Sequence, residues 1–196
     1  MYARLGLSVA VAGSLVVAQE AAAQSAQPWS VQASLLAAGQ DINGGLVSGV
    51  GFEGQLRYAR GVWSVGAGYQ TSRHEAGDES IRISGFFLEP RYAIDIGSER
   101  IAPYVAGRIA LLKQKSELHD PGNANSPLFD TESSGSAFGA GGGLIIRATS
   151  NINIDLGAAF VSQSFAEVRG EGRVFQFSRF TGYVAKGGLS FGFGGQ

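Results

Sequence analysis

The sequence predicts an all-β fold, an eight-stranded antiparallel up-and-down transmembrane β-barrel, and three observations lead to it. Apolar residues alternate with small or polar residues along most of the chain, which is the side-chain period of a β-strand. The links between the alternating segments are short and long in turn. Charged residues make up 16% of the 196 residues, below the roughly 25% that is typical of soluble domains.

The alternation is clearest in VWSVGAGYQ, where Trp63 and Tyr69 share one face of a strand and Ser64 and Gln70 share the other. After Gln27 there is little helical periodicity and no apolar run of about 18 residues, the length that indicates a spanning helix. Neither a helical bundle nor a further spanning helix is therefore predicted. The predicted strands are residues 29–37, 49–59, 62–70, 84–94, 101–114, 136–148, 152–163 and the C-terminal stretch that ends near residue 193.

The predicted links alternate in length along the chain. Short links fall at residues 59–61, 95–100 and 149–151. Longer or more polar links, predicted to be loops, fall at residues 39–45, 72–80, 117–134 and 164–174. Transmembrane barrels have short periplasmic turns and longer external loops, and an even number of strands places both termini in the periplasm.

Aromatic residues fall near both ends of the predicted strands. In the last strand Tyr183 and Phe193 are ten residues apart on the apolar face. This spacing corresponds to about 33 Å along the strand and, at a tilt of about 40°, to about 25 Å in height, which matches the apolar band of a transmembrane barrel. The predicted girdles are Trp29, Tyr58, Trp63 and Tyr92 near the periplasmic ends and Tyr69, Phe138, Phe160 and Tyr183 near the external ends.

The alternative fold is a soluble barrel or sandwich with its apolar face turned inward. Such a protein carries charge and larger residues on its outer face. Here the apolar face carries almost no charge, and the polar face is rich in glycine, as the narrow lumen of an eight-stranded barrel requires. The membrane barrel is therefore favoured.

The N-terminus has the order of a secretory signal peptide. The basic start MYAR is followed by an apolar run from Leu5 to Ala18 and then by small residues up to Ala23. We expect residues 1–23 to be a cleaved signal peptide and residues 24–196 to be one outer-membrane β-barrel domain. The chain has no cysteine, so its stability must come from burial or from lipid rather than from disulfides.

The last strand carries the pattern Lys186-x-Gly188-x-x-Phe191-x-Phe193. It resembles the C-terminal signal by which bacterial outer-membrane barrels are passed to their insertion machinery, although three residues follow Phe193 here where those chains usually end. The mature chain as a whole resembles the small eight-stranded barrels of the outer-membrane protein A and X type and the opacity-protein-like surface antigens. The resemblance implies location in the cell outer membrane, contact with its lipid and with the insertion machinery, and a monomer.

Charged residues of both signs fall on the face that is predicted to line the lumen. An unpaired charge there would cost several kcal/mol, so we expect an interior network of ion pairs and hydrogen bonds. The favoured interpretation is a polar plug, which also fits the family that the chain resembles. A narrow channel for small polar solutes is the alternative, because charges in membrane proteins often mark ion pathways. The predicted network comprises Glu53, Arg57, Glu89, Arg91, Arg108, Arg147, Asp155 and Lys186, of which all but Arg57 and Arg147 fall at middle heights.

No residue pattern predicts catalysis, a cofactor or a metal site. His74 and His119 fall in predicted external loops beside acidic residues, where solvated loops are favoured over a divalent-ion site. The net charge of −1 provides no footprint for nucleic acid. We expect a non-enzymatic protein with a structural or surface-interaction role, and an outer-membrane enzyme acting on lipid remains a second alternative.

The external loops are the candidate contact surface for a partner, because binding residues concentrate on loops held by a rigid scaffold. The last loop is predicted to form a hairpin that turns at residues 169–172, with the final strand extending outward to about Val174. Phe175, Phe177 and Phe180 of this region form an exposed contact surface, pack on neighbouring loops or lie at the lipid head groups.

Two prolines fall inside predicted strands. Pro90 and Pro103 each remove a donor from the hydrogen-bond ladder. A closed barrel has no edge on which to place them, and both lie toward periplasmic ends. Local fraying or a bulge is therefore expected at these positions.

Overall fold

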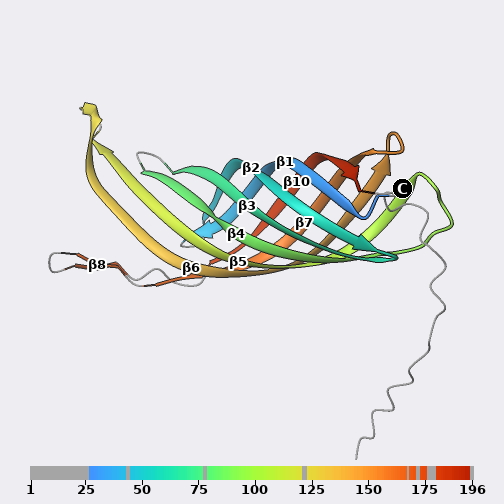
Figure 1. The fold of residues 1–196 in the computed structure, drawn as a ribbon. Coiled ribbons are helices and arrows are strands. Elements are labelled where there is room, and N and C mark those ends of the chain that lie inside the picture. The colour runs from blue at the N-terminus through green and yellow to red at the C-terminus, as the bar shows by residue number, and fades with distance from the viewer. Residues whose placement is uncertain are drawn as a thin grey trace, which may run out of the picture.

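The computed structural model describes residues 27–42, 45–76, 79–120, 123–166, 168–170, 173–175 and 180–194. Within them, eight strands form a closed barrel in the order β1-β10-β7-β6-β5-β4-β3-β2, and two short strands form a separate sheet (Figure 1). The predicted fold class is confirmed, while the expected signal peptide lies outside the described residues. The barrel strands are β1 (Trp29–Ile42), β2 (Gly45–Arg60), β3 (Trp63–Ala76), β4 (Glu79–Ala93), β5 (Ile101–Asp120), β6 (Asn123–Arg147), β7 (Ile152–Phe165) and β10 (Phe180–Phe193), and the short strands are β8 (Val168–Gly170) and β9 (Arg173–Phe175).

The last strand closes the barrel against the first. β10 pairs antiparallel with β1, from Trp29 opposite Phe193 to Gln40 opposite Gly182, and with β7 on its other side. Each barrel strand therefore has two neighbours, which removes the unpaired edges of an open sheet. We call the end where β1 begins the terminal end, and the opposite end the hairpin end.

The connections at the terminal end are short, as predicted. Gly61 and Val62 join β2 to β3, residues 94–100 join β4 to β5, and residues 148–151 join β6 to β7. Gly61 and Gly97 have φ angles of 59° and 70°, in the left-handed region where glycine is favoured because it has no Cβ.

The hairpin end differs from the predicted long loops. The strands continue through most of the segments expected to be loops, so that only residues 43–44, 77–78 and 121–122 separate the paired strands. The ladder extends because antiparallel pairing satisfies the backbone groups of both strands of a hairpin, so a polar composition alone does not end a strand. The outermost pairs are Ile42 with Gly45, Ala76 with Glu79 and, beyond a register shift at residues 118–120, Asp120 with Asn123.

The last hairpin forms where the sequence predicts it. β8 pairs with β9 from Val168 opposite Phe175 to Gly170 opposite Arg173. The residues between β9 and β10 lie outside the described part of the chain, so the expected extension of the final strand to about Val174 stays a prediction. Phe180, the first residue of β10, packs against Phe165 with ring centroids 6.4 Å apart, whereas the side chain of Phe175 and all of Phe177 lie outside the described part.

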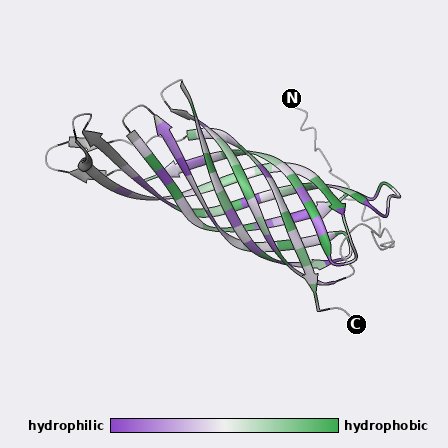
Figure 2. Ribbon diagram, turned by 90° about the horizontal axis from the view of Figure 1, so that it is seen from above, coloured by the Kyte–Doolittle hydropathy of each residue, from purple (hydrophilic) through white to green (hydrophobic). Residues whose placement is uncertain are grey.

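The wall of the barrel is apolar outside and polar inside. Phe160, Leu35 and Leu111 are 81%, 75% and 70% exposed, whereas the inward Glu53 and Asp155 are 1% and 2% exposed. Figure 2 shows the alternation of hydrophobic and hydrophilic residues along the strands. This distribution is the reverse of that in a soluble protein, and it is that of a barrel whose wall faces lipid. Among the described residues no helix is long and apolar enough to cross a membrane, a finding that concerns helices alone.

The distribution reverses again toward the hairpin end of β3 to β6. Inside the barrel an apolar cluster, which we call the hairpin-end core, comprises Ile81, Ile83, Phe87, Ala110, Leu112, Ala137 and Phe165, with Phe180 packed against it. Outside, β3 to β6 expose Arg73, Glu75, Arg82, Lys113 and Glu132. An apolar cluster beneath a charged exterior is typical of a water-soluble barrel, although buried polar side chains such as Ser72, His74 and Gln114 also face inward here. The change of pattern marks one boundary of the apolar band.

The prolines leave the strand register intact. On both sides of Pro90 the β4–β5 register is the same, with Leu88 opposite Ile109 and Arg91 opposite Ala106, and only the pairs between them are missing. The carbonyl oxygen of Pro103 accepts a hydrogen bond of 2.8 Å from the backbone N–H of Ile94, but Pro103 has no N–H to donate in return. Pro90 therefore interrupts the ladder locally and forms no bulge.

The orientation of the wall predicts a position-dependent cost for an added charge. Ala158 faces outward in the middle of β7, so Ala158→Arg should lower the free energy of unfolding in lipid vesicles by about 2–4 kcal/mol, because the guanidinium enters the apolar band. Ser162→Arg, four residues along the same strand toward the hairpin end, should cost about 0–1 kcal/mol. Denaturant titration of both variants in vesicles measures the difference, and equal costs would contradict a lipid-facing wall.

Candidate functional site: a charged cluster in the lumen

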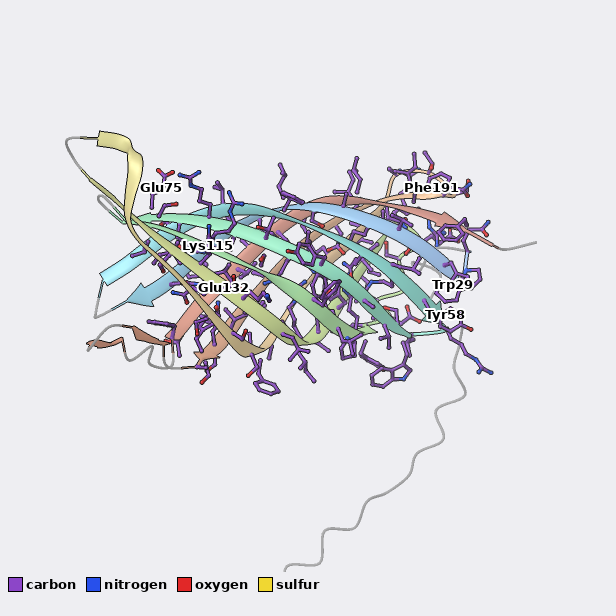
Figure 3. The ribbon with its side chains drawn as sticks, turned by 60° about the vertical axis from the view of Figure 1, so that its left-hand side comes forward. Trp29, Tyr58, Glu75, Lys115, Glu132 and Phe191 are labelled. Atoms are coloured by element: carbon purple, nitrogen blue, oxygen red, sulfur yellow. The ribbon has the colours of Figure 1, made fainter. Side chains whose placement is uncertain are left out.

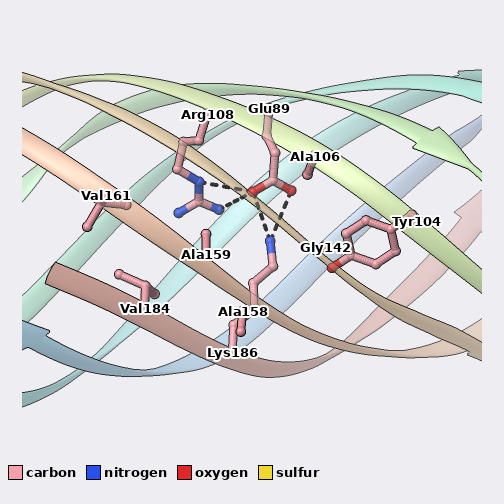
Figure 4. A pocket seen from close by; sticks show the side chains of 10 residues that line it. All are labelled: Glu89, Tyr104, Ala106, Arg108, Gly142, Ala158, Ala159, Val161, Val184 and Lys186. Carbon is pink, nitrogen blue, oxygen red and sulfur yellow. Dashed lines mark hydrogen bonds and ion pairs between the residues drawn. The ribbon is translucent and has the colours of Figure 1, made fainter.

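Glu89 on β4 lies at the centre of a cluster of cations inside the barrel. Its Oε1 accepts hydrogen bonds from Arg57 Nη2 at 2.9 Å and Arg91 Nε at 2.8 Å, and its Oε2 accepts one from Arg108 Nε at 2.9 Å. Lys186 Nζ on β10 lies 2.9 Å from both carboxylate oxygens. Figure 4 shows the side chains of Arg108 and Lys186 converging on this carboxylate. One carboxylate thus holds cations from β2, β4, β5 and β10.

Two further carboxylates complete the cluster. Glu53 Oε2 accepts a hydrogen bond of 2.7 Å from Arg108 Nη2, and Glu53 Oε1 accepts one of 3.3 Å from Lys186 Nζ. Asp155 on β7 accepts a hydrogen bond from Arg91 Nη1 at its Oδ2. The cluster therefore contains four cations and three carboxylates, and its ion pairs join five of the barrel strands.

Neutral side chains satisfy other donors of the arginines. Arg57 donates to Gln55 Oε1 at 2.9 Å and to Ser64 Oγ at 3.0 Å, and Arg108 Nη1 donates to Gln70 Oε1 at 2.9 Å. Tyr104 Oη donates to Asp155 Oδ1 at 2.8 Å, and its ring lies under the Arg91 guanidinium, 4.3 Å from Cζ to centroid. Sequence analysis did not single out these neutral residues, although their parity along the strands places them on the lumen face.

The cluster leaves little empty space at the middle of the lumen. A cavity of about 20 Å³ is lined by Glu89, Tyr104, Arg108 and Lys186 together with small and branched apolar residues, which is room for about one water molecule. On the side toward the hairpin end, the Arg108 guanidinium lies over the ring of Phe87, 4.0 Å from Cζ to centroid. The charged cluster and the hairpin-end core are therefore in direct contact.

The structure brings together seven of the eight charges that sequence analysis assigned to the lumen. Residue counting places Arg57 toward the terminal end, where Arg91 also lies, and the long side chain of Arg57 reaches Glu89. Arg147 lies at the end of β6, opposite Asn153 of β7, and is not among the residues of the ion pairs described above.

The aromatic residues assigned to the girdles lie at the two ends of the apolar wall. At the terminal end Trp29 contacts Tyr58, and Trp63 contacts Tyr92, with ring centroids 4.9 Å apart in each pair. Toward the hairpin end Tyr69 contacts Phe86 at 5.1 Å, and Tyr183 lies opposite Gly39 of β1. A Cβ at Gly39 would lie 2.5 Å from the Tyr183 ring, so the glycine allows the tyrosine to lie flat across β1.

The residues of the C-terminal pattern divide between the two faces of β10. Phe191 and Phe193 are exposed on the outer wall, and Figure 3 shows Phe191 at the same end of the barrel as Trp29 and Tyr58. Lys186 points into the lumen cluster. A Cβ at Gly188 would lie 2.3 Å from Ser34 Oγ and from the Ala33 carbonyl, so only glycine fits there. The role of this pattern as an insertion signal stays a prediction.

The expectation of a solvated loop at His74 is wrong. His74 belongs to β3, points inward and is 1% exposed, with Ser72 Oγ 3.2 Å from its Nε2. The alternation of the strand continues past the predicted boundary and turns the ring into the lumen. The side chain of His119 lies outside the described residues, and no group of three or more potential metal ligands occurs in the described part.

Neutralisation of Glu89 should destabilise the barrel strongly. Glu89→Gln leaves four buried cations with two carboxylates, and removal of one partner from a buried ion pair costs about 3–5 kcal/mol. Glu132→Gln, which breaks an exposed pair with Lys113, is the matched control and should cost less than about 1 kcal/mol. Guanidinium titration of the detergent-folded variants compares the two, and similar costs would show that the cluster adds no stability.

Comparison with known proteins shows a likeness in fold. No protein-family model matches the chain, and no curated protein matches it in sequence. The crystal structure of Neisserial surface protein A is 18% identical, with a TM-score of 0.68 over 85% of this chain and 97% of that chain. The attachment invasion locus protein Ail of Yersinia pestis, solved in complex with the heparin analogue sucrose octasulfate, is 16% identical, with a TM-score of 0.53 over 83% of this chain and 97% of that chain. The chain thus has the small closed-barrel fold of these proteins.

Proposed function

We propose that the chain is a non-enzymatic protein of the bacterial outer membrane with a structural or surface-interaction role, and that its lumen is closed. The observation that carries the proposal is the position of Glu89, held by four cations in mid-barrel directly beneath the hairpin-end core. Because the charged cluster and the hairpin-end core occupy the lumen, partners can reach only the surface that lies beyond the membrane.

Two layers of different chemistry support a closed lumen. The charged cluster ties five strands together across the lumen with ion pairs, and the hairpin-end core follows it with apolar side chains such as Phe87 and Leu112. An ion that passed the charges would next meet the apolar side chains of β4 to β7 and, at the same level, buried polar side chains such as Ser72, His74 and Gln114. Apolar lining of a narrow lumen hinders conduction because it excludes water. A narrow channel for small polar solutes is the alternative that the conductance experiment below tests.

The chemistry of the wall supports the membrane placement. Backbone groups in hydrocarbon must be paired within the protein, so only helices and closed barrels span a bilayer. A closed antiparallel barrel with an exposed apolar band and aromatic residues at both edges is the architecture of outer-membrane proteins. The fold likeness to Neisserial surface protein A and to Ail supports the same placement.

The hairpins beyond the membrane are the proposed contact surface. β5 and β6 are 20 and 25 residues long, against 14 to 16 for the other barrel strands, and their hairpin reaches beyond the rest of the barrel (Figure 1). Paired strands hold a contact surface more rigidly than free loops do. Because Ail was solved with a sulfated heparin analogue, sulfated glycans are a suitable first class of probe for a surface partner.

Planar bilayer recordings test whether the lumen is closed. The wild-type protein should give no steady unit conductance, because the cluster and the core fill the lumen. Removal of two adjoining parts of the plug in Phe87→Ala/Arg108→Ser should produce openings, while Phe86→Ala, a change on the outer wall, should stay silent. Steady wild-type openings that disappear or change selectivity in Arg108→Ala would establish the channel instead.

Assembly in cells tests the proposed contact with the insertion machinery. Phe193→Ala should lower the amount of folded barrel in the outer membrane, measured by heat-dependent gel mobility, and should leave the stability of the purified folded protein nearly unchanged. Phe160→Ala removes another exposed aromatic side chain from the neighbouring strand β7 and should accumulate like the wild type. Equal accumulation of both variants would remove the support for an insertion signal at Phe193.

A further inference from the structure

Four cations gather on the outer wall of β3, β4 and β5. Arg73 lies directly opposite Arg82 in the strand register, and Arg82 lies directly opposite Lys115. Lys113 precedes Lys115 by two residues and therefore shares its face. The side chains of Arg73 and Lys113 are 54% and 69% exposed. We call these four residues the basic patch.

Three of the four cations of the basic patch have interaction partners, and Lys115, one of these three, lies opposite Glu132 in the strand register. Arg73 Nε lies 3.3 Å from Glu75 Oε1, and Lys113 Nζ lies 2.8 Å from Glu132 Oε1. Arg82, between the flanking cations, forms no ion pair with any carboxylate whose side chain is described. Like charges directly opposite each other on adjacent strands destabilise a sheet. An anion bound between these cations would remove that repulsion.

The basic patch lies at the boundary of the apolar band. Arg73 is ten residues along β3 from Trp63, and Arg82 is ten residues along β4 from Tyr92. Ten residues at a tilt of about 40° correspond to about 25 Å in height, the thickness of the band. Exposed Phe86 and Leu111 lie on the terminal side of the basic patch. Figure 3 shows Glu75, Lys115 and Glu132 at the opposite end of the barrel from Trp29 and Tyr58.

Among the described side chains, the cations of the basic patch lie on β3 to β5. Along the edge of the apolar band on β6, β7 and β10, the outward positions are Ser136, Ser162 and Thr181. A general attraction of the barrel rim for anions would need cations around the whole circumference. The arrangement is instead that of a site on β3 to β5, apolar below and basic above, which matches a lipid with an anionic head group.

We propose that the basic patch binds the phosphate of a lipid head group at the hairpin-end face of the membrane. Arg82 and its neighbours donate to the phosphate oxygens, and the acyl chains lie along the exposed side chains of Phe86 and Leu111. The proposal rests on the membrane placement of the barrel and is independent of whether the lumen is closed. A soluble polyanion, such as a sulfated sugar, has similar charge but lacks acyl chains that could contact the apolar wall next to the basic patch.

Lipid titration of the detergent-folded protein, followed by native mass spectrometry, tests the proposal. Phosphatidic acid is the probe, and phosphatidylcholine is the neutral reference. Arg73→Gln/Arg82→Gln should weaken retention of phosphatidic acid about thirtyfold, because each cation near a membrane surface contributes about fivefold to anionic lipid binding. Arg60→Gln/Arg100→Gln removes two exposed cations at the terminal end, with the same change in net charge. It should change retention less than about twofold, since both lie at the opposite end of the barrel from the basic patch.

The outcomes separate the lipid site from its rivals. Heat-dependent gel mobility first establishes that both double variants are folded. Equal losses in the two variants, or no preference of the wild type for phosphatidic acid, would overturn the proposal. Binding of sucrose octasulfate at the basic patch without retention of phosphatidic acid would assign it to a soluble glycan instead. If Arg73→Gln/Arg82→Gln still inserts into vesicles and stays non-conducting, a loss of lipid binding leaves the proposed function intact.

Discussion

The constraint on which the structure depends is that charge placed inside this barrel has no route to water except along the lumen. Each buried cation must therefore find a carboxylate on another strand, and Glu89 serves four of them at once. A shift of one residue would turn these charges to the opposite face of the barrel, so the observed register is one that brings Glu53, Glu89 and Asp155 together with their cations. The ion pairs thus favour this register as well as fill the centre of the barrel.

The same strands face lipid along one part of their length and water along another. In the band that faces lipid, strands carry apolar residues outward and keep glycine or polar residues inside. Farther along β4 and β5 the parity stays constant, but the chemistry is exchanged, so that Ile83 and Leu112 point inward and Arg82 and Lys113 point outward. The strand geometry is continuous through the boundary, and only the choice of side chain records which solvent lies outside.

The sequence predicts the strand number, the closed topology and the short turns, because period-two alternation and turn residues are local signals. It also predicts the parity of the lumen charges. It does not predict where strands end at the hairpin end, since a ladder continues wherever backbone groups can pair. One local signal within the expected loop at residues 39–45 is Asn43-Gly44, because this dipeptide is typical of two-residue hairpins and favours strands that continue up to the turn. The partners within the cluster depend on side-chain reach across the lumen, as with Arg57, which residue counting cannot supply.

The hairpin-end core has a consequence for the exposed hairpins. Its apolar side chains pack together because burial removes them from water, so the shape of the hairpin-end core does not depend on the surrounding bilayer. The hairpins beyond the membrane are therefore anchored to a packed core that does not need contact with lipid. Sequence change at the tips is then separated from the membrane wall by a packed layer, and the surface presented to the environment can diversify without disturbing the part that inserts.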